Sequence, residues 1–160
     1  MRSENRQLVA EHHPEAIVVS CIDWRFRDNI TDAALTKAVF VSFGVERFFE
    51  IRMAGGAKNI ASPDRPGRLE TILDDLRLAL KKGIKKIILL NHGNHCAKYA
   101  EDKYDFTDPD TERVFHEKEL RLAGDILFSH FPEAEILLGY AFLDKDDKVV
   151  IDRIRHSTAS

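Results

Sequence analysis

Cysteine is scarce in this chain, since its 160 residues include only Cys21 and Cys96. A chain of this length can bury a sizeable core without covalent cross-links, so the fold does not need a disulfide. The N-terminal residues lack the apolar segment of a signal peptide, and we therefore expect a cytoplasmic location, where thiols stay reduced. In such a setting two cysteines more often bind a metal or react than pair with each other.

The chain also lacks a large excess of charge of one sign, and it lacks long apolar runs. The net charge of −3 is built from charges of both signs scattered along the chain, which gives no basic surface for a nucleic acid partner. No apolar run approaches the roughly 20 residues that cross a membrane. No glycine-rich dinucleotide fingerprint or P-loop follows the first apolar run, so a nucleotide would lack its phosphate cradle.

What the sequence does contain is an alternation of apolar runs with helical patterns. Four short apolar runs predict strands, at 16–22, 48–54, 85–91 and 135–144, and the first, rich in β-branched residues, is typical of a strand buried on both faces. The patterns between them predict helices from Thr31 or Asp32 to about Phe40, from Pro66 to Gly83, and over 111–130. We therefore predict one α/β domain over residues 1–160: a mostly parallel four-stranded sheet flanked by helices, with a possible antiparallel edge strand at 149–154.

Side chains capable of chemistry follow three of the predicted strands. The first strand leads into CIDWR, the second into AGGAKN and the third into NHGNHC. The carboxyl ends of parallel strands meet at one edge of a sheet, where binding sites usually lie. We therefore expect one cluster there, made of Cys21, Asp23, Arg25, His92, His95 and Cys96. Two cysteines and a histidine suit zinc, with a fourth position left open for a water whose pKa falls to about 7.

Simpler interpretations exist for each of these residues alone. Cys21 could be a small core residue, His92 a packed histidine, and Asp23 with Arg25 a surface ion pair. None of these explains why all of them fall at strand ends. A Cys-x5-Arg phosphatase pattern ending at Arg27 is disfavoured, because the intervening loop lacks glycine and carries a carboxylate where phosphate would bind. His116 falls on a predicted helix surface and is assigned no role.

The segment Cys21-Ile-Asp23-Trp-Arg25 resembles the signature of the β-class carbonic anhydrases, Cys-x-Asp-x-Arg. IRMAGGAKNI is similar to the second strand and loop of small, divergent members, and the order of elements follows that family over roughly residues 15 to 155. The resemblance implies that Cys21, His92 and a second cysteine bind zinc. It also implies that Asp23 accepts a hydrogen bond from zinc-bound hydroxide or, in a closed state, occupies the fourth position. Arg25 would pair with Asp23 and hold it away from the metal.

The second family motif departs from the pattern. The family has His-x-x-Cys, whereas here three residues separate His92 from Cys96. Cys96 keeps the family's distance to Tyr99, which favours it as the third ligand. His95 restores the family's spacing from His92 and is the competing candidate.

These features predict a zinc enzyme that hydrates CO2 reversibly to bicarbonate and a proton. The alternatives are hydrolysis of a CO2-like molecule such as carbonyl sulfide or carbon disulfide, and a catalytically silent zinc-binding protein of the same fold. The resemblance further implies a homodimer or higher homo-oligomer in which a second subunit walls the pocket. The segment 39–49, VFVSFGVERFF, is more apolar than an exposed loop should be and is a candidate for that contact.

Overall fold

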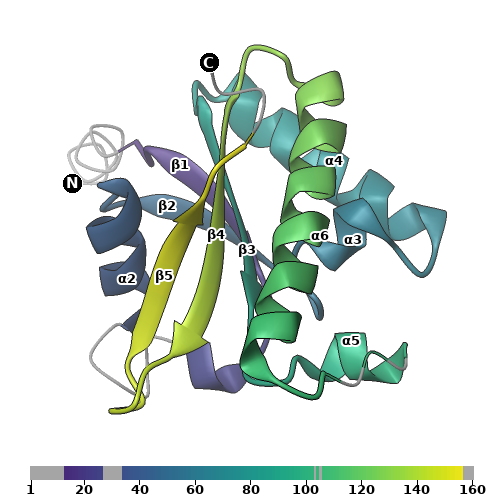
Figure 1. The fold of residues 1–160 in the computed structure, drawn as a ribbon. Helices are drawn as coiled ribbons and strands as arrows, with labels where there is room; N and C mark the ends of the chain where they lie inside the picture. The colour runs from purple at the N-terminus through teal and green to yellow at the C-terminus, as the bar shows by residue number, and fades with distance from the viewer. Residues whose placement is uncertain (1–12, 27–33, 103, 105, 157–160) are drawn as a thin grey trace, which may run out of the picture.

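Five strands form a single sheet in the computed structural model, which describes residues 13–26, 34–102, 104 and 106–156. The strand order is β2-β1-β3-β4-β5 (Figure 1). All neighbouring strands are parallel except β4 and β5, which are antiparallel. The strands are β1 (Ala16–Ser20), β2 (Phe48–Arg52), β3 (Lys86–His92), β4 (Glu135–Leu143) and β5 (Val149–Ile154). The predicted fold class is confirmed, including its antiparallel edge strand.

Helices cover both faces of this sheet. Helices α3, α4 and α6 pack on one face, and α2 lies against the other (Figure 1). The helices are η2 (Trp24–Phe26, a 3-10 turn), α2 (Ala34–Phe43), α3 (Lys58–Ala61), α4 (Pro66–Lys81), α5 (Ala97–Glu101) and α6 (Pro109–His130). The predicted start of the first helix, at Thr31 or Asp32, lies outside the described residues. None of the helices described is both long and apolar enough to cross a membrane.

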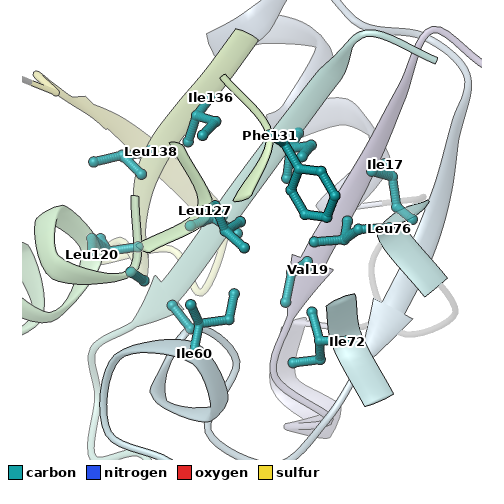
Figure 2. Close-up of a cluster of buried hydrophobic side chains, with 14 of the residues drawn as sticks. Ile17, Val19, Ile60, Ile72, Leu76, Leu120, Leu127, Phe131, Ile136 and Leu138 are labelled. Atoms are coloured by element: carbon teal, nitrogen blue, oxygen red, sulfur yellow. The ribbon is translucent and has the colours of Figure 1, made fainter. Parts of the chain in front are cut away.

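The continuous apolar run of β1 is explained by burial on both faces. Ile17 and Val19 belong to the larger core, beneath α3, α4 and α6, as Figure 2 shows. Ala16 and Val18 point to the opposite side and pack with residues of α2. Successive side chains of a strand alternate between faces, so a strand between two helical layers must be apolar throughout.

Local signals fix the two long helices. Pro66 occupies the first turn of α4, where its missing N–H costs no hydrogen bond. Asp108 caps α6, because its side chain accepts a hydrogen bond from the backbone N–H of Thr111 at 2.8 Å. Pro109 follows this cap, so α6 begins two residues earlier than its predicted range of 111–130.

Two of the three strands that lead into the polar motifs end earlier than predicted, whereas β3 ends one residue later, at His92. β1 ends at Ser20 and β2 at Arg52, so the residues that follow lie in loops. The apolar segment 39–49 is a loop only at residues 44–47: the rest of it is the end of α2 and the start of β2. Within it Val41 is 74% exposed and Phe49 is 48% exposed. This segment therefore presents apolar side chains to the outside.

Candidate metal centre

Three loops meet at the carboxyl edge of the sheet. β1 lies between β2 and β3 and is parallel to both, so the residues after these strands are neighbours. Cys21 directly follows β1, and its sulfur accepts a hydrogen bond from the backbone N–H of Gly55, after β2, at 3.3 Å. His92 is the last residue of β3, and Cys96 precedes the first turn of α5.

Cys21, His92 and Cys96 form a group with the spacing of a metal site. One donor atom from each lies within 4.8 Å of the others, and the two sulfurs are 3.9 Å apart. His92 and Cys96 are buried, at 4% and 3% exposure, whereas Cys21 is partly exposed. Neither cysteine is in a disulfide. The structure thus brings together the three residues expected to bind zinc; their binding of it stays a prediction.

The orientation of His92 leaves one ring nitrogen facing this group without a partner. Its Nδ1 lies 2.7 Å from the Gly93 carbonyl oxygen, which can only accept, so Nδ1 carries the proton. Nε2 then has a free lone pair, and it is buried with no hydrogen-bond partner. An orphaned buried acceptor is costly unless something binds it. A carbonyl that holds the other ring nitrogen is also the usual support of a metal-binding histidine, so this donor set fits zinc.

The two thiols differ in acidity. A hydrogen bond from Cys96 is the largest effect on the Cys21 thiol and lowers its pKa, although burial opposes it. The same contact with Cys21, together with burial, raises the pKa of Cys96. Without a metal, Cys21 is therefore the thiol that ionises first. A bound cation would stabilise both thiolates and so allow Cys96 to ionise as well.

Asp23 and Arg25 form a two-pronged ion pair beside this group. Arg25 Nε donates to Asp23 Oδ1 at 3.0 Å, and Arg25 Nη2 donates to Oδ2 at 2.7 Å. Burial favours the neutral carboxyl, but these hydrogen bonds outweigh it and lower the pKa of Asp23. Asp23 Oδ2 also lies 3.6 Å from His92 Nε2. An ionised carboxylate therefore borders the space that the candidate ligands face.

His95, the competing candidate, is not part of the group. Its side chain is exposed, and its backbone adopts a left-handed conformation with φ of 60°. Among the residues described, the group with metal-ligand spacing contains Cys96 instead. The additional residue between His92 and Cys96 is taken up by the loop.

The sequence interpretation missed the role of Gly56 in the AGGAKN loop. Gly56 has φ of 52°, and a Cβ there would lie 2.6 Å from the Leu90 carbonyl oxygen and 3.3 Å from the Cys21 nitrogen. Both neighbours are backbone atoms, one in β3 and the other directly after β1, so they have no room to move aside. The glycine lets the loop after β2 approach Cys21 closely.

Replacing Gly56 by alanine is expected to destabilise the protein by about 3 kcal/mol, from left-handed strain and overpacking together. The matched control is Gly67→Ala at the start of α4, where a Cβ would meet no atom within 4 Å. That variant should be as stable as the wild type or slightly more stable. Urea unfolding followed by circular dichroism measures both; equal stabilities for the two variants would contradict the packing described here.

The expectation that His116 lies on a helix surface is wrong. His116 is fully buried on α6, and burial lowers its pKa to about 3, so the ring is neutral. It contacts Asn91, the residue before His92, whose side-chain oxygen accepts from the Ala57 N–H at 3.0 Å. This bond fixes the Asn91 amide so that its nitrogen donates to Tyr99 Oη at 2.9 Å and to His116 Nδ1 at 3.3 Å. The proton of the neutral His116 ring is then on Nε2.

No protein-family model and no curated protein matches the chain. Solved structures do match. The structure of the β-carbonic anhydrase CcaA is 17% identical with a TM-score of 0.55, over 99% of this chain and 84% of that one. Carbonic anhydrase from Glaciozyma antarctica is 18% identical with a TM-score of 0.50, over 97% and 96% of the two chains. Tetrameric β-carbonic anhydrases from Sordaria macrospora match at 15% identity and a TM-score of 0.52, over 94% and 85%.

The chain therefore has the fold of the β-carbonic anhydrases. The resemblance noticed in its motifs is confirmed for the fold. At these identities the shared fold does not carry over an activity, which has to be argued from the site itself.

Proposed function

We propose that the chain binds one zinc ion through Cys21, His92 and Cys96 and hydrates CO2 reversibly to bicarbonate and a proton. The observation that supports this most strongly is the buried, unpartnered Nε2 of His92 beside two sulfurs. When bound there, zinc supplies a Lewis acid that makes water a hydroxide nucleophile near pH 7. A reducing compartment such as the cytoplasm suits this site, because both thiols must stay reduced.

The proposed role of Asp23 is to orient the nucleophile. Because its pKa is lowered, its carboxylate is ionised at neutral pH and only accepts hydrogen bonds. It can accept the O–H of the nucleophile and so direct the oxygen lone pair towards the carbon of CO2. Arg25 holds both carboxylate oxygens at once, which keeps Asp23 at the border of the site. Asp23 is in turn a route by which the product proton leaves.

Hydration itself tests this proposal. Zinc-loaded protein should hydrate CO2 in a stopped-flow indicator assay between pH 6 and pH 9, and chelated protein should recover activity when zinc is added. Carbonyl sulfide and carbon disulfide are assayed on the same samples. If zinc-loaded protein hydrates no CO2 at any of these pH values, the proposal fails. If it instead hydrolyses only carbonyl sulfide or carbon disulfide, the protein is a hydrolase of a CO2-like molecule.

We also propose that the chain acts as a homodimer or higher homo-oligomer. In the CIDWR segment Ile22 and Trp24 are 55% and 62% exposed, although the residues between and around them face the site. Further large apolar side chains, Phe40, Val41 and Phe49, are exposed on α2 and β2. Exposed apolar side chains of this size often mark a contact with another subunit. The similar proteins from Sordaria macrospora are described as tetrameric.

Sedimentation velocity at micromolar concentration is expected to show a species heavier than the 18.3 kDa monomer. Trp24→Ser should shift the distribution towards monomer, because it removes a large apolar side chain from the contact. Leu78→Ser, which changes an exposed leucine of α4, is the control and should leave the distribution unchanged. A wild-type protein that sediments only as monomer would count against the oligomer.

A further inference from the structure

The residues between His92 and Cys96 adopt an unusual backbone conformation. Asn94 has φ of 59° and His95 has φ of 60°, so two consecutive residues with side chains are left-handed. Each such residue costs on the order of 1 kcal/mol or more, and the cost persists only where surrounding contacts impose the conformation. Gly93 precedes them, and the Tyr140 hydroxyl occupies the place that a Cβ at this position would take.

Contacts from three distant parts of the chain hold this loop. Arg25 Nη1 donates to the Asn94 carbonyl oxygen at 2.8 Å, and its Nη2 donates to the His95 carbonyl oxygen at 3.3 Å. Asn94 Oδ1 accepts the backbone N–H of Leu143, at the end of β4, at 3.0 Å. The backbone N–H of His95 donates to Glu112 Oε1, on α6, at 2.9 Å. Residues of η2, β4 and α6 therefore all form hydrogen bonds with the two left-handed residues.

Glu112 is the least expected of these partners. It is 4% exposed, and a carboxylate is seldom buried so deeply unless it is bound by donors. Its Oε1 also lies 4.0 Å from Nε2 of His116, the ring nitrogen that carries the proton. Within the part of the chain that the structure describes, that nitrogen has no hydrogen-bond partner. The hydrogen bond from the His95 N–H and the nearby His116 ring, which contacts Asn91, both connect Glu112 to the segment that carries His92 and Cys96.

We propose that Glu112 and Asn94 are positioning residues: they hold the lengthened His92–Cys96 loop so that Cys96 reaches the same ion as Cys21 and His92. This inference rests on the zinc site proposed above. The same loop conformation presents two carbonyl oxygens to Arg25, which leaves its remaining donors for Asp23. One loop therefore sets both the third ligand and the orientation of the Asp23–Arg25 pair. The longer spacing between His92 and Cys96 is compatible with metal binding in this chain because Glu112 on α6 accepts the hydrogen bond that holds the loop.

Cobalt(II) binding tests this inference, because thiolate-to-cobalt absorption reports on the sulfur ligands without any assay of activity. Glu112→Met removes the acceptor at similar length, and Glu112→Gln retains an oxygen that accepts from the His95 N–H. Asn94→Gly keeps the left-handed backbone but loses the bond to Leu143, whereas Asn94→Asp keeps that acceptor. Glu117→Met, on the same helix but without contact to the loop, is the matched control.

Glu112→Met and Asn94→Gly should each weaken cobalt and zinc binding by about 10-fold to 100-fold, the usual effect of losing a residue that supports a ligand. Their thiolate absorption should also fall or shift. Glu112→Gln, Asn94→Asp and Glu117→Met should stay within about three-fold of the wild type. Should Glu112→Met fail to fold, Asn94→Gly decides the question, because glycine tolerates the backbone conformation.

Wild-type affinity and an unchanged cobalt spectrum in Asn94→Gly, and in Glu112→Met where it folds, would overturn the positioning role while leaving the zinc site intact. Equal losses in Glu112→Gln and Glu112→Met would also overturn it, since the acceptor would not be what matters. A wild-type protein that binds neither cobalt nor zinc would instead refute the zinc site, and the positioning role with it.

Discussion

Cys21→Ser is expected to lose nearly all bound zinc and all measurable CO2 hydration. A serine hydroxyl is a harder and far less acidic donor than a thiol, so zinc would keep only His92 and Cys96. The loss of affinity should exceed the roughly 100-fold that a change in a supporting residue costs. Elemental analysis of protein purified without added metal measures it, against about one zinc per wild-type chain.

The third ligand is decided by a pair of variants. Cys96→Ser should lose zinc as Cys21→Ser does, because Cys96 is buried in the group with its sulfur 3.9 Å from that of Cys21. His95→Asn should retain zinc, because its imidazole is exposed and asparagine tolerates the left-handed backbone at this position. The reverse outcome, with zinc kept in Cys96→Ser and lost in His95→Asn, would contradict the site.

Asp23→Asn is expected to keep zinc but to hydrate CO2 more slowly by about ten-fold or more, as when a positioning or proton-transfer group is lost. The amide has the shape of the carboxylate, yet it also donates hydrogen bonds and no longer fixes the nucleophile in one orientation. Because the pKa of Asp23 is lowered, the wild-type carboxylate stays ionised through the neutral and alkaline range. The defect should therefore persist across pH 7 to 9.

Arg25→Lys tests the partner of Asp23 in the same assay. Lysine has one ammonium and cannot make the paired contacts to both carboxylate oxygens. Asp23 would be freer to move towards the metal, so hydration should fall most at low pH, where hydroxide competes poorly. Wild-type rates between pH 7 and 9 in both Asp23→Asn and Arg25→Lys, with zinc retained, would remove this pair from the proposed mechanism.

The fold was predictable because its signals are local. The apolar run of β1 and the buried face of α4, formed by Ile72, Leu73, Leu76 and Ala79, each depend on residues close together in sequence, and Pro66 marks where α4 begins. The candidate ligands Cys21 and His92 were predictable for a related reason, since parallel strands bring the residues that follow them to one edge.

The sequence favoured Cys96 over His95 through its distance to Tyr99, but the backbone conformation that brings Cys96 to the group was not predictable, because the loop between His92 and Cys96 is shaped by distant residues. Its left-handed backbone depends on Arg25, Leu143 and Glu112, which no local pattern connects to it. The burial of His116 was missed because the inward face of α6 begins with polar residues. Glu112 and His116 precede Leu120, Ala123 and Leu127 on that face, and a polar start suggests a surface.

X-ray absorption at the zinc edge of the purified wild-type protein tests the central claim most directly, because it counts the sulfur ligands of the bound ion. The site of Cys21, His92 and Cys96 predicts two sulfur atoms at about 2.3 Å and nitrogen or oxygen atoms at about 2.0–2.1 Å. A shell made only of nitrogen and oxygen, or protein that takes up no zinc at all, would contradict it.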